Sequence, residues 1–331
     1  MTDYQPPFEI STKIIYQISA ISEQIGLLDS QNLQSSPQLR KQNRIRTIQS
    51  TLAIEGNSLS LEQVTAIVEG KRILGSQREV AEVQGAIRAY EVLTDWNPSS
   101  IVHFQQAHHL LMSEILIEAG KFRKGQVGIH KGDQVVHIAP PAKRVPQLMA
   151  DLMQWLKTSK DHALIKSCVF HYELEFIHPF MDGNGRMGRL WQTLILGKWN
   201  ALFYRLPIES LIKDQQERYY QTLEEADRSA NSTVFIEFML DIIEETLIQN
   251  STQNQASSDQ VSDQVSDQVQ KLLDLMDNQY WSAQDLMKKL NLSHKPTFRK
   301  NYLNSALQAG LLLSEYPDKP RSPKQRYKKV F

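Results

Sequence analysis

The chain has 331 residues, of which 41% are hydrophobic and 22% charged, as in ordinary globular proteins with a sizeable core. Lys plus Arg and Asp plus Glu number 37 each, so the overall charge identifies no partner. Cys168 is the only cysteine, which excludes an internal disulfide and favours a reducing compartment. The sequence has neither the pattern of a signal peptide nor an apolar run near the ~18 residues that a membrane span needs. We therefore expect a cytoplasmic protein with no membrane partner.

Helical periodicity is common as far as Asn250, whereas strand patterns are scarce. The expected helices cover residues 33–55, 60–70, 78–93, 101–117, 145–155, 163–176, 187–199, 214–227 and 233–249. Ser60 and Gln63 have the spacing of a capping box, and Gly70 is expected to end the helix that they begin. Residues 126–137 predict a β-hairpin, because two short β-prone runs flank Lys131-Gly132-Asp133.

The composition changes after Asn250. Residues 251–270 are polar and contain the repeat SDQVSDQVSDQV, which indicates a low-complexity linker or a frayed helix. Three short helices are expected next, at 269–276, 282–290 and 296–309, followed by a hairpin over 311–330. The basic residues of this hairpin are Lys319, Arg321, Lys324, Arg326, Lys328 and Lys329. Three helices followed by a basic hairpin are typical of a winged-helix module.

The most informative stretch is residues 178–189, which read HPFMDGNGRMGR. Gly183 and Gly185 allow backbone N–H groups to converge on an anion at the start of a helix. Arg186 and Arg189 are three residues apart on one helix face and can both reach phosphate oxygens. In the same loop, Asp182 can hold Mg²⁺, His178 can act as a general base, and Asn184 can donate to a phosphate oxygen. Together they predict a polyphosphate site with a base beside it.

This segment matches the signature of the Fic family, HxFx(D/E)GNGRxxR, at every specified position, and the chain is similar to that family from about residue 10 to 245. The resemblance implies a mainly α fold: a Fic-type helical bundle with a small β-hairpin flap, here followed by a C-terminal winged helix-turn-helix domain. The implied organisation is an N-terminal helical region over 1–100, with an inhibitory helix at about 37–56, then a Fic core over 101–250, a polar linker over 251–270 and a winged-helix module over 271–331.

Proteins of this kind are adenylyltransferases, which move AMP from ATP to a protein hydroxyl and release pyrophosphate. The resemblance implies ATP and Mg²⁺ as cofactors, a Ser, Thr or Tyr target on another protein or on the chain itself, and a homodimer. It implies that His178 deprotonates the target hydroxyl and that Asp182 carries Mg²⁺. The expected ATP-binding residues are Glu55, Gly183, Asn184, Gly185, Arg186, Met187, Gly188, Arg189, Tyr220 and Phe235. The expected flap residues, which would align the target chain by strand-like pairing, are Gln126, Val127, Gly128, Ile129 and His130.

Some of these residues also have purely structural interpretations. Aromatic side chains at helical spacing, such as Tyr220 and Phe235, are commonly part of a core rather than a nucleobase platform. The hairpin at 126–137 is equally consistent with an ordinary surface hairpin.

A second informative stretch ends the helix expected at 33–55. Ile45, Ile48 and Leu52 form an apolar stripe, and the next position on that stripe is Glu55. A carboxylate there faces the core and lies in the last helical turn, where the helix dipole disfavours negative charge, so it needs a cationic partner such as Arg189 or Arg186. The stretch Thr51 to Gly56 resembles the inhibitory motif (S/T)xxxE(G/N) of the Fic family. The resemblance implies that Glu55 pairs with Arg189 and blocks productive seating of the γ-phosphate.

Three other functions remain open from the sequence. The chain could transfer a phosphoryl group or another nucleotide, although Asn184-Gly185 argues against the phosphoryl-transferring branch. It could remove AMP, because some family members use the inhibitory glutamate to activate water. It could also be a DNA-binding regulator whose Fic-type domain senses nucleotide, with DNA bound through residues 271–331. For that module, protein docking or dimerisation is the alternative.

Overall fold

The computed structural model describes residues 4–30, 37–131, 134–264, 267–277, 279–292, 294–308, 311–317, 322 and 324–329. The chain divides into two compact units, Met1–Asn250 and Ser251–Phe331. Among the described residues, no helix combines the length and apolar character needed to cross a membrane.

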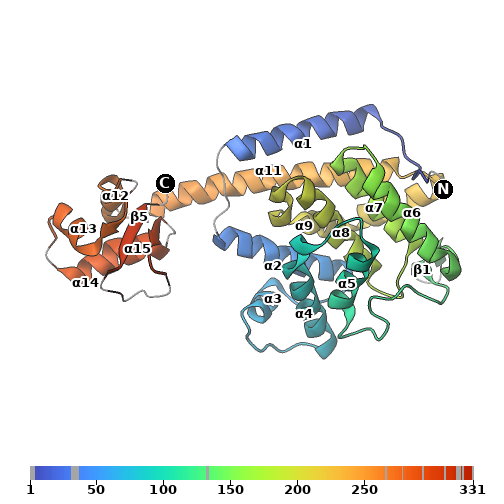
Figure 1. Ribbon diagram of the computed structural model, residues 1–331, viewed down its shortest axis with the longest axis horizontal. Helices are drawn as coiled ribbons and strands as arrows, with labels where there is room; N and C mark the ends of the chain where they lie inside the picture. Colours follow the sequence, from blue (N-terminus) through green and yellow to red (C-terminus); the bar gives the residue numbers. More distant parts are fainter. Residues whose placement is uncertain are drawn as a thin grey trace. The chain divides into compact units, whose positions relative to one another are not determined.

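The first unit is a bundle of helices with one two-stranded antiparallel sheet (Figure 1). Its α-helices are α1 Thr12–Ser30, α2 Pro37–Ile54, α3 Leu61–Val68, α4 Gln77–Glu91, α5 Ile101–Met112, α6 Val145–Thr158, α7 Ala163–Ile177, α8 Asn184–Trp199, α9 Ile208–Asp214, α10 Gln216–Ser229 and α11 Thr233–Gln264, which begins in this unit. Its 3₁₀ turns are η1 Leu93–Asp95, η2 Ala142–Arg144 and η3 Ala201–Arg205. Its strands are β1 Gly128–Lys131 and β2 Gln134–Ile138.

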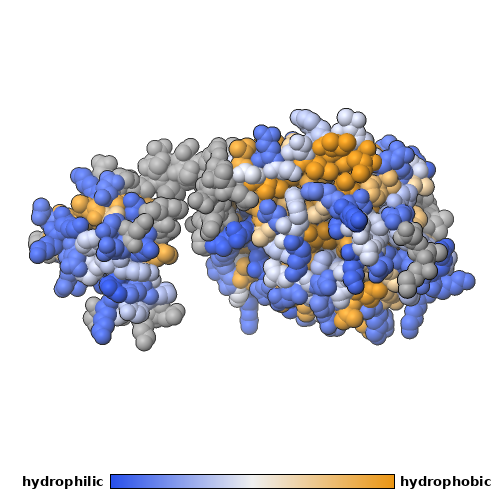
Figure 2. Space-filling view, turned by 45° about the horizontal axis from the view of Figure 1, so that its top comes forward, coloured by the Kyte–Doolittle hydropathy of each residue, from blue (hydrophilic) through white to orange (hydrophobic). Residues whose placement is uncertain are grey.

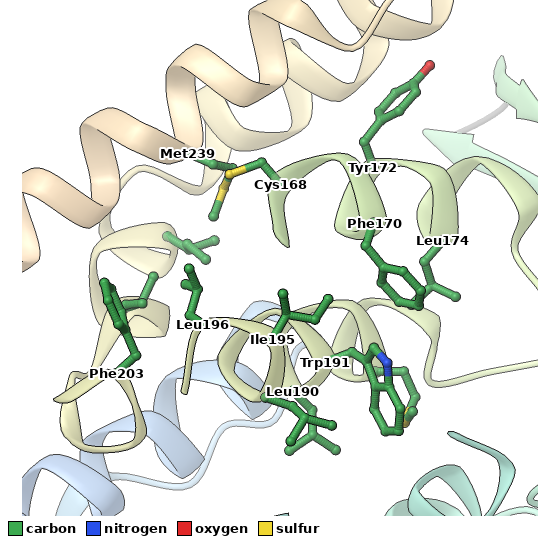
Figure 3. Close-up of a cluster of buried hydrophobic side chains, with 14 of the residues drawn as sticks. Cys168, Phe170, Tyr172, Leu174, Leu190, Trp191, Ile195, Leu196, Phe203 and Met239 are labelled. Carbon is green, nitrogen blue, oxygen red and sulfur yellow. The ribbon is translucent and has the colours of Figure 1, made fainter. Parts of the chain in front are cut away.

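The centre of this unit is the antiparallel pair α7 and α8, which carries the candidate site at its connecting loop. Both helices are buried on several sides, so their sequences are apolar around most of the helix rather than along one stripe. Figure 3 shows Phe170 and Leu174 extending from α7 toward Trp191 of α8. Trp191 has no exposed surface and stacks edge-on against Phe104 of α5. This dense packing fixes the ends of both helices, and with them the loop between.

Helix α1 was not among the expected elements. It lies along α11 (Figure 1), where its Gln17 side chain donates to Asp241 at 2.6 Å and to the Glu237 carbonyl at 2.8 Å. Its buried apolar residues follow helical spacing and are Ile14, Ile21, Ile25 and Leu28. The spacing of these four residues therefore suffices to predict α1 from the sequence.

Several other boundaries differ from expectation. The helix expected over 101–117 ends at Met112, because the following residues form turns in which Ile115 and Leu116 donate to the Met112 carbonyl. The helix expected over 214–227 corresponds to α10, and α9 before it was not among the expected elements. Helix α11 continues to Gln264, through much of the stretch expected to be a linker. The valines of the SDQV repeat are four residues apart, a spacing that suits one face of a helix.

The second unit contains α12 Asp267–Asp274, α13 Ala283–Lys289, α14 Lys295–Phe298, the π-helical turn η4 Arg299–Leu303 and α15 Asn304–Gln308. Its strands β3 Trp281–Ser282, β4 Leu312–Ser314 and β5 Arg326–Lys329 form an antiparallel sheet in the order β3-β5-β4. The helix expected over 296–309 is interrupted by the π turn, which lets Phe298 and Leu303, five residues apart, both reach the core. Part of the expected basic hairpin, including Lys319 and Arg321, lies outside the described residues.

The predicted cap of the helix that begins after Ser60 is confirmed. Ser60 and Gln63 form the expected capping box at α3, with Gln63 N donating to Ser60 Oγ and Ser60 N to Gln63 Oε1. Ser282 caps α13 by accepting from Asp285 N. On the surface, Figure 2 shows hydrophilic side chains over most of the visible face of the second unit and larger apolar patches on the first.

Candidate functional site

The loop between α7 and α8 has an unusual backbone that two residues define. His178 follows the last residue of α7 and has a left-handed conformation, with φ 50°. Left-handed backbone is costly for a residue other than glycine and persists only where the surroundings hold it. Gly183 precedes α8 with φ 84°, and a Cβ there would lie 2.8 Å from Met112 Sδ. Glycine is therefore favoured at 183 by its backbone conformation, and a side chain there would also have to displace Met112.

Two side chains support this loop from within. The Asn184 amide accepts from Phe180 N at 2.9 Å and donates to Phe180 O at 3.0 Å. His108 stacks on the Phe180 ring with centroids 3.6 Å apart. Its Nδ1 accepts from Gly120 N, so its Nε2 donates to the Asp182 carbonyl at 2.9 Å. Burial lowers the pKa of His108 to about 4, so the ring is neutral and keeps this donor arrangement at neutral pH.

The Asn184 contact corrects one expectation. Its side-chain amide binds the loop backbone and is only 2% exposed, so it does not face an incoming phosphate. Gly183 supplies no side-chain cap to α8, and the N–H groups of the first turn have no partner further back in the helix. Any contribution from Asn184 and Gly185 to an anion site is therefore through backbone N–H groups at the positive end of the helix dipole.

Both arginines of the motif are held by carboxylates. Arg189 is almost completely buried and donates from Nη2 to Glu55 Oε1 at 2.7 Å. It also donates from Nε to Thr51 Oγ1 at 2.9 Å and from Nη2 to Thr51 O at 3.0 Å. Burial alone would lower the pKa of Arg189, but the Glu55 carboxylate more than offsets this and raises it. Arg186 donates to Asp182 Oδ1 at 2.8 Å and lies 3.5 Å from Glu82 Oε1.

Glu55 lies just after α2, where Gly56 turns the chain with φ 88°. The stripe formed by Ile45, Ile48 and Leu52 is buried as expected. The Glu55 carboxylate lies over the first turn of α8. It is so close that a Cβ added at Gly185 would collide with its Oε1. The structure thus places Glu55 against Arg189 rather than Arg186, directly beside the helix end that would hold an anion.

His178 and Asp182 remain partly accessible. The His178 side chain is 20% exposed, and its Nδ1 is 3.3 Å from the Glu175 carbonyl. The Asp182 side chain is 39% exposed. Its Oδ1 accepts from Gly183 N at 2.6 Å, and its Oδ2 is 3.4 Å from Arg78 Nη2.

Asp182 fits the way proteins hold Mg²⁺ on nucleotides. This ion keeps several waters and needs only one or two carboxylates plus phosphate oxygens. No group of three or more His, Cys, Asp or Glu side chains suited to a metal is found in the part of the chain that the structure describes. One accessible carboxylate beside an anion site is therefore the donor set that a magnesium–nucleotide complex would use.

Three expected ATP-binding residues do not face the site. Phe235 has no exposed surface and packs edge-on against His171 in the core. Met187 is also fully buried, and its N–H is used by the Gly183 carbonyl. Gly188 faces His171, since a Cβ there would lie 2.6 Å from His171 Cδ2. These residues serve packing, which helical spacing alone did not distinguish from binding.

Unlike Phe235, Tyr220 is not part of the buried core. It is 45% exposed, and its hydroxyl is 3.4 Å from the Ile54 carbonyl at the end of α2. Tyr220 therefore borders the stretch that carries Glu55 and remains a candidate for contact with a nucleotide.

The expected hairpin is present in the backbone. Strands β1 and β2 pair in antiparallel fashion with a bulge between Ile129 and His130. Its expected turn at Gly132 and Asp133 lies outside the described residues. Gln126 is exposed and Val127 partly buried, and both precede β1. The root of the hairpin contacts Arg123, a buried side chain that the motif analysis did not identify.

Two family models match this chain. Residues 98–196 match the Fic/DOC family, a range that includes α5, the hairpin, α7 and the candidate site on α8. Residues 267–329 match the "Filamentation induced by cAMP protein Fic-like, C-terminal domain".

Curated relatives and solved structures agree with these matches. Protein adenylyltransferase fic-1 of Caenorhabditis briggsae is 32% identical over 211 residues, covering 59% of this chain and 40% of the relative. Protein adenylyltransferase Fic of Drosophila ananassae is 27% identical over 218 residues, covering 63% and 42%. The chain thus spans about two fifths of the length of these curated relatives.

A crystal structure of a Fic family protein from Desulfovibrio desulfuricans has a TM-score of 0.75 and 49% identity, and the match covers 99% of this chain and 98% of that one. Fic-1 from Caenorhabditis elegans has a TM-score of 0.61 at 24% identity, covering 73% of this chain and 74% of that one, which shows the shared fold alone. Fold, motif and nearly full-length similarity together define the class: the chain belongs to the Fic family.

Proposed function

We propose that the chain is a protein adenylyltransferase, which transfers AMP from ATP to a Ser, Thr or Tyr hydroxyl of a protein, including its own. The observation that carries the proposal is the single loop that joins an accessible imidazole, His178, to the uncapped N-terminus of α8. The names of the curated relatives, protein adenylyltransferases, support the same reaction.

In the proposed mechanism, the N–H groups of the first turn of α8 bind phosphate oxygens of ATP. His178 accepts the proton of the target hydroxyl, and that oxygen attacks the α-phosphorus. The bond between the α-phosphorus and the bridging oxygen to the β-phosphate breaks, and pyrophosphate leaves. The product is a phosphodiester between AMP and the protein. Arg186 and Arg189 supply positive charge for the outer phosphates once their carboxylate partners release them.

Asp182 would hold Mg²⁺, which neutralises charge on the phosphate oxygens when bound. Asp182 Oδ1 also accepts from Arg186, so this pair would have to part before Arg186 could turn toward the nucleotide.

Glu55 is proposed to inhibit this reaction. Its carboxylate lies over the first turn of α8 and pairs with Arg189, so it adds negative charge where the γ-phosphate needs positive charge. Because Glu55 already binds Arg189, a γ-phosphate seated on the same arginine would lie beside a second anion and be repelled by it. The nucleotide could then bind only with its phosphates displaced, and the α-phosphorus would not face His178. Displacement of the end of α2 would release the site.

The reaction type is tested by offering ATP that is labelled on either the α- or the γ-phosphate. AMP transfer labels the protein from the α-labelled nucleotide only, and the Glu55→Gly variant is expected to give the stronger label. Label from the γ position would instead indicate phosphoryl transfer. Label that survives in Glu55→Gly/His178→Ala would show that His178 is not the base.

We also propose that the second unit is a winged-helix module that binds DNA. Its helices and three-stranded antiparallel sheet have the composition of such a module, with exposed Lys295, Arg299 and Lys300 on α14 and η4. Lys324 and Arg326 are exposed at and before β5, where the wing would lie. Basic groups on both features suit contacts with phosphates.

The expected homodimer and the expected cytoplasmic location stay predictions. Sedimentation equilibrium of the full chain tests the first, and fractionation of the native host tests the second.

A further inference from the structure

Arg123 connects three parts of the chain around the candidate site. It lies between α5 and β1 and is only 3% exposed. Its Nε donates to the His178 carbonyl at 2.7 Å, and its Nη2 donates to the Ile177 carbonyl at 3.3 Å. Its Nη1 donates to the Gly125 carbonyl at 2.9 Å.

The same guanidinium also reaches the far side of the hairpin. Its Nη2 donates to the Pro140 carbonyl at 2.5 Å, just after β2, whereas Gly125 lies just before β1. The backbone of Arg123 adds a further bond, from its N–H to the Pro179 carbonyl at 2.8 Å. One side chain therefore joins both roots of the hairpin to the end of α7.

The partners explain why a buried cation is stable here. The carbonyls of Ile177 and His178 lie at the end of α7, where helix carbonyls lack partners and carry partial negative charge. Among the ion pairs of the described residues, Arg123 has no carboxylate partner, so backbone carbonyls alone offset the loss of water. Burial lowers the pKa of Arg123, in line with the absence of a neighbouring anion.

We propose that Arg123 is a positioning residue that sets the hairpin relative to the base, His178. The inference rests on the proposed function, in which the hairpin aligns the target and His178 takes its proton. His178 has a left-handed backbone, and the bond from Arg123 holds its carbonyl in that conformation. Displacement of either partner by about 1 Å would separate the target hydroxyl from the imidazole.

Arginine is suited to this role by its planar fork. Four of its five N–H groups are engaged, in directions that a lysine ammonium cannot reproduce from one atom. The Arg123 guanidinium donates to the end of α7 and to the hairpin roots rather than to α8, so its loss is expected to leave the first turn of α8 in place. Positioning of the target and binding of ATP are therefore separable.

The test introduces Arg123→Lys and Arg123→Met into the full-length Glu55→Gly chain, with Lys124→Met as the matched control, since Lys124 is the exposed neighbour. The experiment measures kcat and KM for ATP in self-modification and the Kd of a non-hydrolysable ATP analogue. It also measures amide hydrogen exchange over residues 128–138. We expect kcat to fall about tenfold or more. KM and Kd should stay within about twofold, and exchange in the hairpin should rise. Lys124→Met should resemble the parent.

Three results would overturn the inference: an unchanged kcat, a Kd that weakens in parallel with kcat, or unchanged exchange in the hairpin. The lysine variant guards against simple misfolding, since it keeps the charge and is expected to retain the melting temperature better than Arg123→Met. If the Glu55→Gly parent transfers no AMP, the proposed function fails. Hydrogen exchange of the hairpin and around His178 still tests the connection through Arg123 in that case.

Discussion

The Arg189 guanidinium and the Glu55 carboxylate meet at 2.7 Å, although the two residues are 134 positions apart in the sequence. Arg189 is almost fully buried, whereas the Glu55 side chain is 30% exposed. Glu55 therefore neutralises the buried Arg189 cation. It does so at the place where a phosphate would need that cation. Stability and the proposed inhibition would therefore depend on the same contact.

Replacing Glu55 should therefore change both the rate of self-modification and the stability of the fold. Glu55→Gly is expected to increase self-modification with AMP by at least about tenfold, because the anion over α8 is removed. It should also lower the free energy of unfolding by about 1–3 kcal/mol, since Arg189 loses a partner. Rates of label incorporation and urea unfolding measure both. Glu55→Gln is the control, because it removes the charge and keeps the size of the side chain. If Glu55→Gly and Glu55→Gln both remain as slow as wild type, inhibition by charge is contradicted.

Asp182 should govern the response to magnesium. Asp182→Asn keeps the shape of the side chain but removes the charge that would bind the ion and that now pairs with Arg186. In the Glu55→Gly background we expect the Mg²⁺ concentration for half-maximal rate to rise about tenfold or more. Asp95→Asn, at an exposed position away from the loop, should leave it unchanged. An identical magnesium titration for the two variants would exclude Asp182 as the ligand.

Glu173 should make the stability of the first unit depend on pH. It is 4% exposed and accepts from the Tyr4 hydroxyl at 2.7 Å. Burial raises its pKa to about 7, with a further contribution from Asp227, whereas the bond from Tyr4 acts in the opposite direction. Because the folded state binds this proton more tightly than the unfolded state, the stabilisation is present below about pH 4.5 and is lost as pH rises through 7.

Glu173→Gln should remove this loss of stability with rising pH. Between pH 5 and 8, wild type is expected to lose about 1–3 kcal/mol of unfolding free energy relative to the variant. Denaturant melts across this range measure the difference. Glu225→Gln, at an exposed position on α10, should run parallel to wild type. Parallel curves for wild type and Glu173→Gln would mean that the buried carboxyl does not titrate in this window.

The second unit should bind duplex DNA in a salt-dependent manner. In the full-length chain, Arg299→Ala/Lys300→Ala is expected to weaken binding to random duplex, and each lost phosphate contact should reduce the slope of log K against log salt by about one. Fluorescence anisotropy at several salt concentrations measures both quantities. Asp285→Asn is a control on the neighbouring helix α13. No binding at low ionic strength would leave protein docking as the role of this module.

Local chemistry was predictable from the sequence, and long-range supports were not. The loop from His178 to Arg189 could be predicted because its glycines, acid and arginines are adjacent in the chain. A cationic partner for Glu55 could be predicted because an acid continues the stripe of Ile45, Ile48 and Leu52, whereas the choice of Arg189 over Arg186 came from the resemblance to the Fic family.

Residues that act through distant backbone groups had no such pattern. Arg123 binds four carbonyls, and His108 binds Gly120 and Asp182, without any motif that would identify them. The expected role of Phe235 was wrong because the aromatic pattern of a core helix resembles that of a nucleobase platform. The side chain of Asn184 was assigned to phosphate, whereas the adjacent Phe180 backbone already uses it.

Intact-mass analysis after incubation with ATP and Mg²⁺ tests the central claim most directly, on wild type, Glu55→Gly and Glu55→Gly/His178→Ala. We predict little change in wild type, a mass gain of one or more AMP groups in Glu55→Gly, and none in the double variant, which should still bind ATP. An unmodified Glu55→Gly chain, or a double variant modified as fully as its parent, would contradict the account.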